Sequence, residues 1–298
     1  MSAPGDERHQ LVVVRAGPLT TVQDLGRGGW AHLGVPTSGA ADRASLRLAN
    51  RLVGNRERAA ALEVTVGGLE VRAVAALTVA VTGASCPITV AGVPSPSRTV
   101  LPLPAGATLR LGAAVAGVRA YLAVRGGVDV PPVLGSRSTD TLSGLGPAAL
   151  MDGDVLAAGS EVAGWPVLTI APGAEPAGGT VRLAAIFGPR DGSLAASGRD
   201  LLQHTTWRVS HRSDRVGLRL VGPPLPVLAT TGMASEGVVR GAIQVPPGGE
   251  PVLFLADHPV TGGYPVVAVV AEADVDRAAQ LRPGQGLRFE PRPAPDWV

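Results

Sequence analysis

Five stretches of this chain gather polar side chains and glycines between apolar segments. The first, TTVQDLGRGG (Thr20 to Gly29), places Gln23, Asp24 and Arg27 after an apolar run. A carboxylate and a guanidinium at one strand end can move a proton and bind an anion. An internal Asp–Arg pair in a simple turn explains the same pattern, so both interpretations remain open.

The second stretch, HLGVPTSGAADRASLRLANRLVGN, is a Gly/Pro/Ser loop that leads into a helical pattern. Ser38 or Asp42 is placed to cap this helix. The backbone amides of Gly39 and Ala40 would also suit an anion. The residues therefore predict a helix start and leave an anion-binding loop as the alternative.

The third and fourth stretches combine arginine with hydroxyls and carboxylates. LGSRSTDTLSGLG carries Ser136, Arg137 and Asp140 between apolar segments, and SHRSDRVGLRLVGPPL places Arg215 just before a strand. Arginine beside small hydroxyls suits a carboxylate or phosphate ligand. A solvated surface loop is the alternative in both cases.

The fifth stretch holds an acid, an amide, a histidine and a glycine pair within about thirty positions. Its candidate residues are Glu236, Gln244, Asp257, His258, Thr261, Gly262, Gly263 and Tyr264. Asp257 and His258 ahead of a Gly-Gly turn suggest acid–base chemistry with oxyanion-stabilising amides. Adjacent side chains of a strand point to opposite faces, so the two would pair only if the chain bends there. A histidine satisfied within the loop is the alternative.

The elements that would position these residues are mostly strands. Short apolar runs recur at the spacing typical of sandwiches and barrels. Gly67-Gly68 predicts one hairpin, and residues 246–249 predict another. Helices are expected at Arg43 to Val53, at Ser193 to Gln203, and from near Asp274 to a point before Pro283.

The predicted fold is therefore mainly β with a few short helices. The stretch APGAEPAGGT is the best candidate boundary between two β subdomains. We expect an N-terminal subdomain with one helix at 11–170 and a C-terminal subdomain at 171–291.

Composition excludes several kinds of chemistry. The chain has 298 residues, and 45% are hydrophobic, which is enough for a large core. All 26 basic residues are arginine. Without lysine the chain cannot supply a Schiff base, a P-loop lysine or a biotinyl-lysine acceptor.

Partners and compartment are constrained in the same way. The net charge of +2 without a basic run argues against nucleic-acid binding. No long uncharged apolar run or apolar signal core is present, so we expect neither a membrane span nor export. The single cysteine, Cys86, fits a reducing cytoplasm and a core position. The histidines lack ligand spacing, so no metal site is expected.

Six motifs, taken in order, resemble one family. They are TTVQDLGR, GVPTSGAADRASLRLANRLVGN, YLAVRGGVDVPPVLGSRSTD, SDRVGLRL, SEGVVRGAIQVP and TGGYPVVAVV. Together they resemble the allophanate hydrolase subunit 2 family over roughly Leu11 to Pro291. This family is also called the KipA family or the family of the C-type 5-oxoprolinase subunit. Pro259 and Val260 replace polar positions of the family pattern.

The resemblance implies a cyclophilin-like β-barrel and a KipI-like partner, the B-type 5-oxoprolinase subunit. It implies a third, LamB/YcsF-like partner of the A type, and an ATP-dependent 5-oxoprolinase that opens pyroglutamate to glutamate. ATP would bind in the complex at a site the sequence does not locate, and this chain would carry no biotin. The alternatives are a carboxyltransferase half acting on a urea-like substrate, with biotin carried elsewhere, and a KipA-type non-catalytic regulator of a KipI kinase inhibitor.

Site roles follow from combining this resemblance with the residues. One of Arg27, Arg137 and Arg215 would hold the substrate carboxylate. Serines and glycine amides would polarise the lactam oxygen. The proposed catalytic residues are Asp24, Arg27, Asp140, Asp257 and His258. The proposed substrate-binding residues are Gln23, Ser38, Asp42, Ser136, Arg137, Arg215, Glu236, Gln244, Thr261, Gly262, Gly263 and Tyr264.

Overall fold

A computed structural model describes residues 9–165, 168–173, 175–228 and 233–293. The chain forms two compact units. The first contains residues up to 27, 42–140 and 144–176, and the second contains 28–41, 141–143 and the chain from 177 onward. Two short segments of the N-terminal half, 28–41 and 141–143, therefore belong to the second unit.

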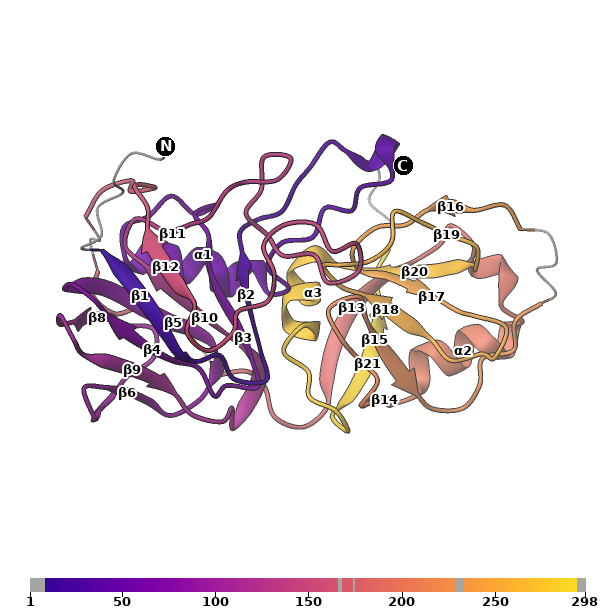
Figure 1. The fold of residues 1–298 in the computed structure, drawn as a ribbon. Coiled ribbons are helices and arrows are strands. Elements are labelled where there is room, and N and C mark those ends of the chain that lie inside the picture. The colour runs from indigo at the N-terminus through magenta and orange to yellow at the C-terminus, as the bar shows by residue number, and fades with distance from the viewer. Residues whose placement is uncertain (1–8, 166–167, 174, 229–232, 294–298) are drawn as a thin grey trace. The chain divides into compact units, whose positions relative to one another are not determined.

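The first unit is built from two sheets (Figure 1). The seven-stranded sheet has the order β11-β12-β1-β4-β9-β6-β7. Its strands are β1 (Gln10–Arg15), β4 (Glu70–Ala73), β6 (Ile88–Val90), β7 (Val93–Ser95), β9 (Thr108–Leu111), β11 (Val128–Asp129) and β12 (Val155–Ala158). The five-stranded sheet has the order β2-β3-β10-β5-β8. Its strands are β2 (Leu19–Gln23), β3 (Ala61–Thr65), β5 (Leu77–Ser85), β8 (Val100–Leu103) and β10 (Ala116–Val124).

Alternating apolar residues from both sheets form one shared core, so this unit is a sandwich. Leu11 and Val71 of one sheet and Leu62 and Leu122 of the other are buried in it. Helix α1 (Arg43–Leu52) packs against β5 and β10 of the five-stranded sheet. The helix predicted from Arg43 to Val53 is confirmed.

The hairpin predicted at Gly67-Gly68 is wrong. β3 pairs with β2 and β10, whereas β4 pairs with β1 and β9, so the chain crosses from one sheet to the other here. Gly67 and Gly68 have φ of 97° and 87°. The glycine pair makes a sharp turn between layers, and alternation alone does not tell this turn from a hairpin.

The second unit is a closed seven-stranded barrel with the order β13-β20-β17-β18-β15-β14-β21 (Figure 1). Its strands are β13 (Val181–Phe187), β14 (Trp207–Val209), β15 (Gly217–Val221), β17 (Ala242–Gln244), β18 (Val252–Phe254), β20 (Val266–Val270) and β21 (Gly286–Pro291). A separate pair joins β16 (Glu236–Gly237) to β19 (Thr261–Gly262). The hairpin predicted at 246–249 is confirmed, because β17 and β18 pair antiparallel.

The barrel core centres on Trp207, which is fully buried with Leu183, Ile243 and Leu253. Helices α2 (Ala196–His204) and α3 (Glu272–Ala278) contribute Leu202 and Val275 to this core. Single 3₁₀ turns lie at Ala31–Leu33 and Asp191–Ser193. The predicted fold class, mainly β with a barrel and few helices, is confirmed. No helix in the described ranges is both long and apolar enough to cross a membrane.

The turn at Gly67 provides a stability test. An added Cβ at Gly67 would lie 2.1 Å from the carbonyl oxygen of Gly112, whereas at Gly92, with φ of 79°, it would meet nothing within 4 Å. Gly92→Ala should cost about 1–2 kcal/mol for the positive φ alone. Gly67→Ala should add an overpacking cost of about 1–3 kcal/mol. Urea unfolding of both variants measures the difference, and equal losses would contradict it.

Candidate functional site

The carboxylate of Asp257 in the second unit accepts five hydrogen bonds. Arg215 donates to it through Nε at 2.9 Å and Nη2 at 3.0 Å, one bond to each oxygen. Ser38 Oγ donates at 2.7 Å, and Thr141 donates through N at 2.9 Å and Oγ1 at 2.7 Å. Asp257 and Arg215 are 0% and 2% exposed, so this is a buried bidentate ion pair with three further donors.

These contacts determine the charge of Asp257. Burial raises its pKa, but the charge of Arg215 and the hydrogen bonds from Arg215, Thr141 and Ser38 outweigh that effect. The pKa of Asp257 therefore lies below its ordinary value. A carboxylate that stays ionised and accepts five hydrogen bonds is suited to positioning chain segments. The predicted proton-transfer role of Asp257 stays a prediction.

The segment Ser38–Ala41 is held in place by two arginines of the second unit. Arg215 Nη2 donates to the carbonyl of Gly39, and Arg240 Nη2 donates to the carbonyl of Ala41, both at 2.7 Å. Arg240 is itself bound to Asp276 at 2.7 Å. The segment thus has its shape set by side chains about 180 to 200 positions later in the chain.

The helix cap is Asp42 rather than Ser38. Asp42 Oδ1 accepts from the backbone N–H of Ser45 at 2.9 Å, whereas Ser38 Oγ donates to Asp257. The backbone N–H of Asp42 donates to the hydroxyl of Tyr121, which in turn donates to Glu63. Burial first, and then the nearby charges of Glu63 and Asp42, raise the pKa of Tyr121 well above its ordinary value.

A second saturated carboxylate lies in the first unit. Asp24 accepts from the backbone N–H groups of Gly26 and Arg137 at 2.7 Å each, from Ser136 Oγ at 2.6 Å and from Ser138 Oγ at 2.5 Å. Asp24 and Ser136 therefore meet, although the sequence places them in different stretches. In this setting Asp24 fixes the 136–138 loop, and its proposed catalytic role stays a prediction.

The other candidates of the first unit surround this loop. Gln23 Nε2 donates to the carbonyl of Thr139 at 2.9 Å. Asp140 is 1% exposed, and its backbone N–H donates to Leu145 at 2.8 Å. Arg27 Nη2 donates to the carbonyl of Ser138. Arg137 points away from Asp24 and binds Asp129 at 3.1 Å and the carbonyl of Val130 at 2.8 Å.

The candidates of the fifth stretch form a third group. Glu236 pairs with Gly262 in the β16–β19 ladder and binds Arg190 through its side chain. Gln244 Nε2 donates to the carbonyl of Tyr264 at 2.8 Å. Gly262-Gly263 does not join paired strands, because β18 and β20 each pair with β17. The segment between β18 and β20 is a loop closed by β16, not a simple hairpin.

His258 has a defined orientation. Its Nδ1 lies 2.7 Å from the carbonyl oxygen of Pro259, which requires a proton on Nδ1. In the neutral ring, Nε2 is then the proton acceptor. Among described residues the carboxylate of Asp257 contacts no histidine, so these neighbours do not form an Asp–His pair.

Sequence reasoning missed several participants. Thr141 supplies two of the five bonds to Asp257, and the carbonyls of Gly39 and Ala41 receive the arginines. Thr141 follows Asp140 in the polar run of the third stretch, so a signal for it existed. Carbonyl groups carry no signal in the sequence.

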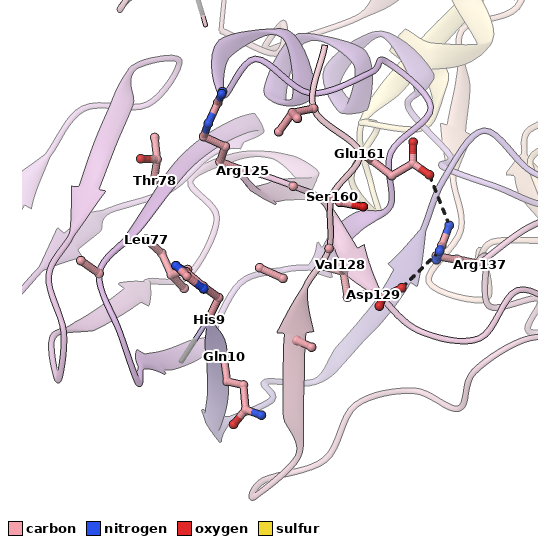
Figure 2. Close-up of a pocket in the computed structure, with 16 residues that line it drawn as sticks. His9, Gln10, Leu77, Thr78, Arg125, Val128, Asp129, Arg137, Ser160 and Glu161 are labelled. Carbon is pink, nitrogen blue, oxygen red and sulfur yellow. Dashed lines mark hydrogen bonds and ion pairs between the residues drawn. The ribbon is translucent and has the colours of Figure 1, made fainter. Parts of the chain in front are cut away.

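The first unit contains a cavity of about 880 Å³, and its lining shows whether it could bind the triphosphate of ATP (Figure 2). The arginines that line it are Arg125 and Arg137. Arg137 lies between Asp129 and Glu161, and Arg125 Nη1 donates to the carbonyls of Val53 and Gly164. Both guanidinium groups are already engaged, so this cavity does not fit a triphosphate.

Two other chemistries are constrained by the geometry. Within the described ranges, no three His, Cys, Asp or Glu residues gather closely enough to hold a metal ion. Burial, with a smaller effect from Glu175, raises the pKa of the Cys86 thiol to about 11. Cys86 is therefore protonated at neutral pH and is a poor nucleophile.

Comparison with known proteins identifies the family of this chain. The chain belongs to the carboxyltransferase domain family, because residues 33–291 match its subdomains A and B. The resemblance found in the six motifs is confirmed by two relatives that match over most of their length.

The chain is 38% identical to the C subunit of 5-oxoprolinase from Escherichia coli (strain K12), over 94% of this chain and 90% of that protein. It is 33% identical to the C subunit of 5-oxoprolinase from Haemophilus influenzae, over 91% and 87% of the two chains. The crystal structure of the K. lactis urea amidolyase matches 97% of this chain with a TM-score of 0.89 and 31% identity. This chain spans 19% of that larger protein.

The ion pair at Asp257 predicts an acid-sensitive stability. Asp257→Asn leaves Arg215 buried without a counter-charge and should cost about 3–5 kcal/mol of unfolding free energy at pH 7. Because the native pKa is depressed, the wild-type contribution is complete above the unfolded value of about 3.9 and is lost as pH falls below it. Urea unfolding between pH 3 and pH 7 should show the gap to Asp257→Asn narrowing in acid. A constant gap would contradict this account.

Substitutions in the pair Gly262-Gly263 test the hydrogen bond between Gln244 and Tyr264. An added Cβ at Gly262 would lie 2.5 Å from Gln244 Nε2, whereas one at Gly263 would meet nothing within 4 Å. Gly262→Ala should therefore displace Gln244 from the carbonyl of Tyr264, and Gly263→Ala should not. Side-chain amide NMR signals of Gln244 would report the displacement, and equal shifts in both variants would exclude it.

Proposed function

We propose that this chain is the C-type subunit of an ATP-dependent 5-oxoprolinase that opens 5-oxoproline to glutamate together with other chains. The observation that carries the proposal is the 38% identity to a 5-oxoprolinase C subunit, which extends over nine-tenths of both chains. Similarity to urea amidolyase covers a fifth of that protein.

The chemistry of the chain supports one component of a complex rather than a complete enzyme. An ATP-dependent lactam hydrolase has to bind a triphosphate, and this sequence contains no lysine. The two arginines of the large cavity in the first unit are already engaged. We therefore propose that the nucleotide is bound with residues of another chain.

Within this chain we assign proton transfer to His258. Its Nδ1 is fixed by the carbonyl of Pro259, which sets the tautomer. Asp24 and Asp257 are engaged by four and five hydrogen bonds and hold the loops around them. The proposed partners are the KipI-like B-type and the LamB/YcsF-like A-type subunits, in the cytoplasm.

The purified chain should show no turnover of 5-oxoproline, because the nucleotide chemistry lies elsewhere. Co-expression with the A-type and B-type partners should give ATP hydrolysis that depends on 5-oxoproline and yields glutamate. Coupled ADP release and glutamate assays, with each chain omitted in turn, measure this. Full turnover by the isolated chain would contradict partner dependence.

The second candidate is a carboxyltransferase half, favoured by the TM-score of 0.89 to a urea amidolyase. It predicts urea-dependent ATP hydrolysis that needs bicarbonate and a biotin carboxylase and is blocked by avidin. A complex that assembles but turns over neither substrate would instead favour the non-catalytic regulator.

A further inference from the structure

Three arginines were candidates for holding the substrate carboxylate, and the structure separates them. Arg215 gives Nε and Nη2 to Asp257, and Nη2 also reaches the carbonyl of Gly39. Arg137 faces two carboxylates, with Asp129 at 3.1 Å and Glu161 at 3.9 Å. The charge of each of these arginines is neutralised within the chain.

Arg27 is different. It is 1% exposed, and its Nη1 has no hydrogen-bond partner. Its hydrogen bonds go to backbone carbonyls, from Nη2 to Ser138 and from Nε to Val133 at 3.4 Å. Throughout the described ranges, no carboxylate lies within ion-pair distance of Arg27.

The nearby carboxylate of Asp24 is not available to Arg27. Both Asp24 oxygens already accept from Gly26, Ser136, Arg137 and Ser138. Asp24 and Arg27 therefore lie near the same loop of the first unit, but they bond to different groups and not to each other.

An unpaired buried guanidinium is costly. Moving an ion out of water into a protein interior costs several kcal/mol of desolvation free energy, even after the surroundings relax. Arginine cannot relieve this by losing its proton. Two carbonyl dipoles offset only part of the cost, and an anionic ligand would supply the missing charge and an acceptor for Nη1.

We infer that Arg27 is the receptor for the carboxylate of a small ligand, which in the proposed 5-oxoprolinase is the carboxylate of 5-oxoproline. The identity of the acid rests on the proposed function, whereas the anion site rests on the geometry of Arg27. Because the side chain is 1% exposed, binding requires a local opening. The covering chain includes Gly146, where an added Cβ would lie 3.1 Å from Arg27 Nη2.

The test compares thermal midpoints of the full chain during titration with ligands. The carboxylates are 5-oxoproline, acetate and glutarate, and the neutral control is 2-pyrrolidinone, which keeps the lactam ring and lacks the carboxylate. The variants are Arg27→Met and Arg27→Lys. The matched control is Arg110→Met, which removes a surface arginine paired with Glu70 at 2.9 Å in the same unit.

The wild-type midpoint should rise with 5-oxoproline and not with 2-pyrrolidinone. Arg27→Met should weaken the apparent affinity for 5-oxoproline at least tenfold, Arg27→Lys should recover part of it, and Arg110→Met should leave it unchanged. In the reconstituted complex, Arg27→Lys should raise KM for 5-oxoproline more than it lowers kcat, because the contact is to a non-reacting group.

Two results overturn the inference: an unchanged response to carboxylates in Arg27→Met, and no response of the wild-type chain to any of the three carboxylates. Should Arg27→Met fail to fold, an unchanged response in Arg27→Lys also overturns it. A response to acetate or glutarate that needs Arg27, with none to 5-oxoproline, keeps the anion site and removes the proposed substrate.

Discussion

Five hydrogen bonds meet on the carboxylate of Asp257, and they connect four separate pieces of chain. Ser38, Thr141 and Arg215 reach it from three loops. A buried carboxylate without partners would be strongly destabilising. The donors around Asp257 therefore act together, and the loss of one would leave the buried charge less well compensated. The short segments 28–41 and 141–143, which belong to the barrel unit, supply two of these donors, Ser38 and Thr141.

In the first unit, Asp24 is likewise a buried carboxylate that accepts several hydrogen bonds from loop residues. Its donors are two backbone N–H groups and two serine hydroxyls, with no ion pair to it from any residue in the described ranges. Both aspartates thus hold loops in place through these hydrogen bonds. By contrast, His258 has its tautomer fixed by the carbonyl of Pro259, and Arg27 has no counter-charge among the described residues.

Much of the fold was predictable because strand alternation, the helix from Arg43 and the turn at 246–249 are local signals. The error at Gly67-Gly68 arose because a glycine turn looks the same whether the next strand returns to its neighbour or crosses to the opposite sheet. The sequence singled out the carboxylates, hydroxyls and arginines of these two clusters by type, but it did not predict which of them bond to one another. Ser38 and Asp257 are 219 positions apart, and nothing local decides which carboxylate Ser38 meets or that Arg137 turns toward Asp129.

The interleaving of the two units has an evolutionary consequence. A single crossover near residue 176 would pass on Arg215 and Asp257 from one parent and Ser38 and Thr141 from the other. In the recombinant protein, the carboxylate of Asp257 would then depend on donors, Ser38 and Thr141, that evolved in a different parent. Splitting the gene at that point would be more damaging, because the chain that carries the barrel strands would lack the segments 28–41 and 141–143. A fusion or rearrangement that keeps this region whole would preserve every donor of Asp257.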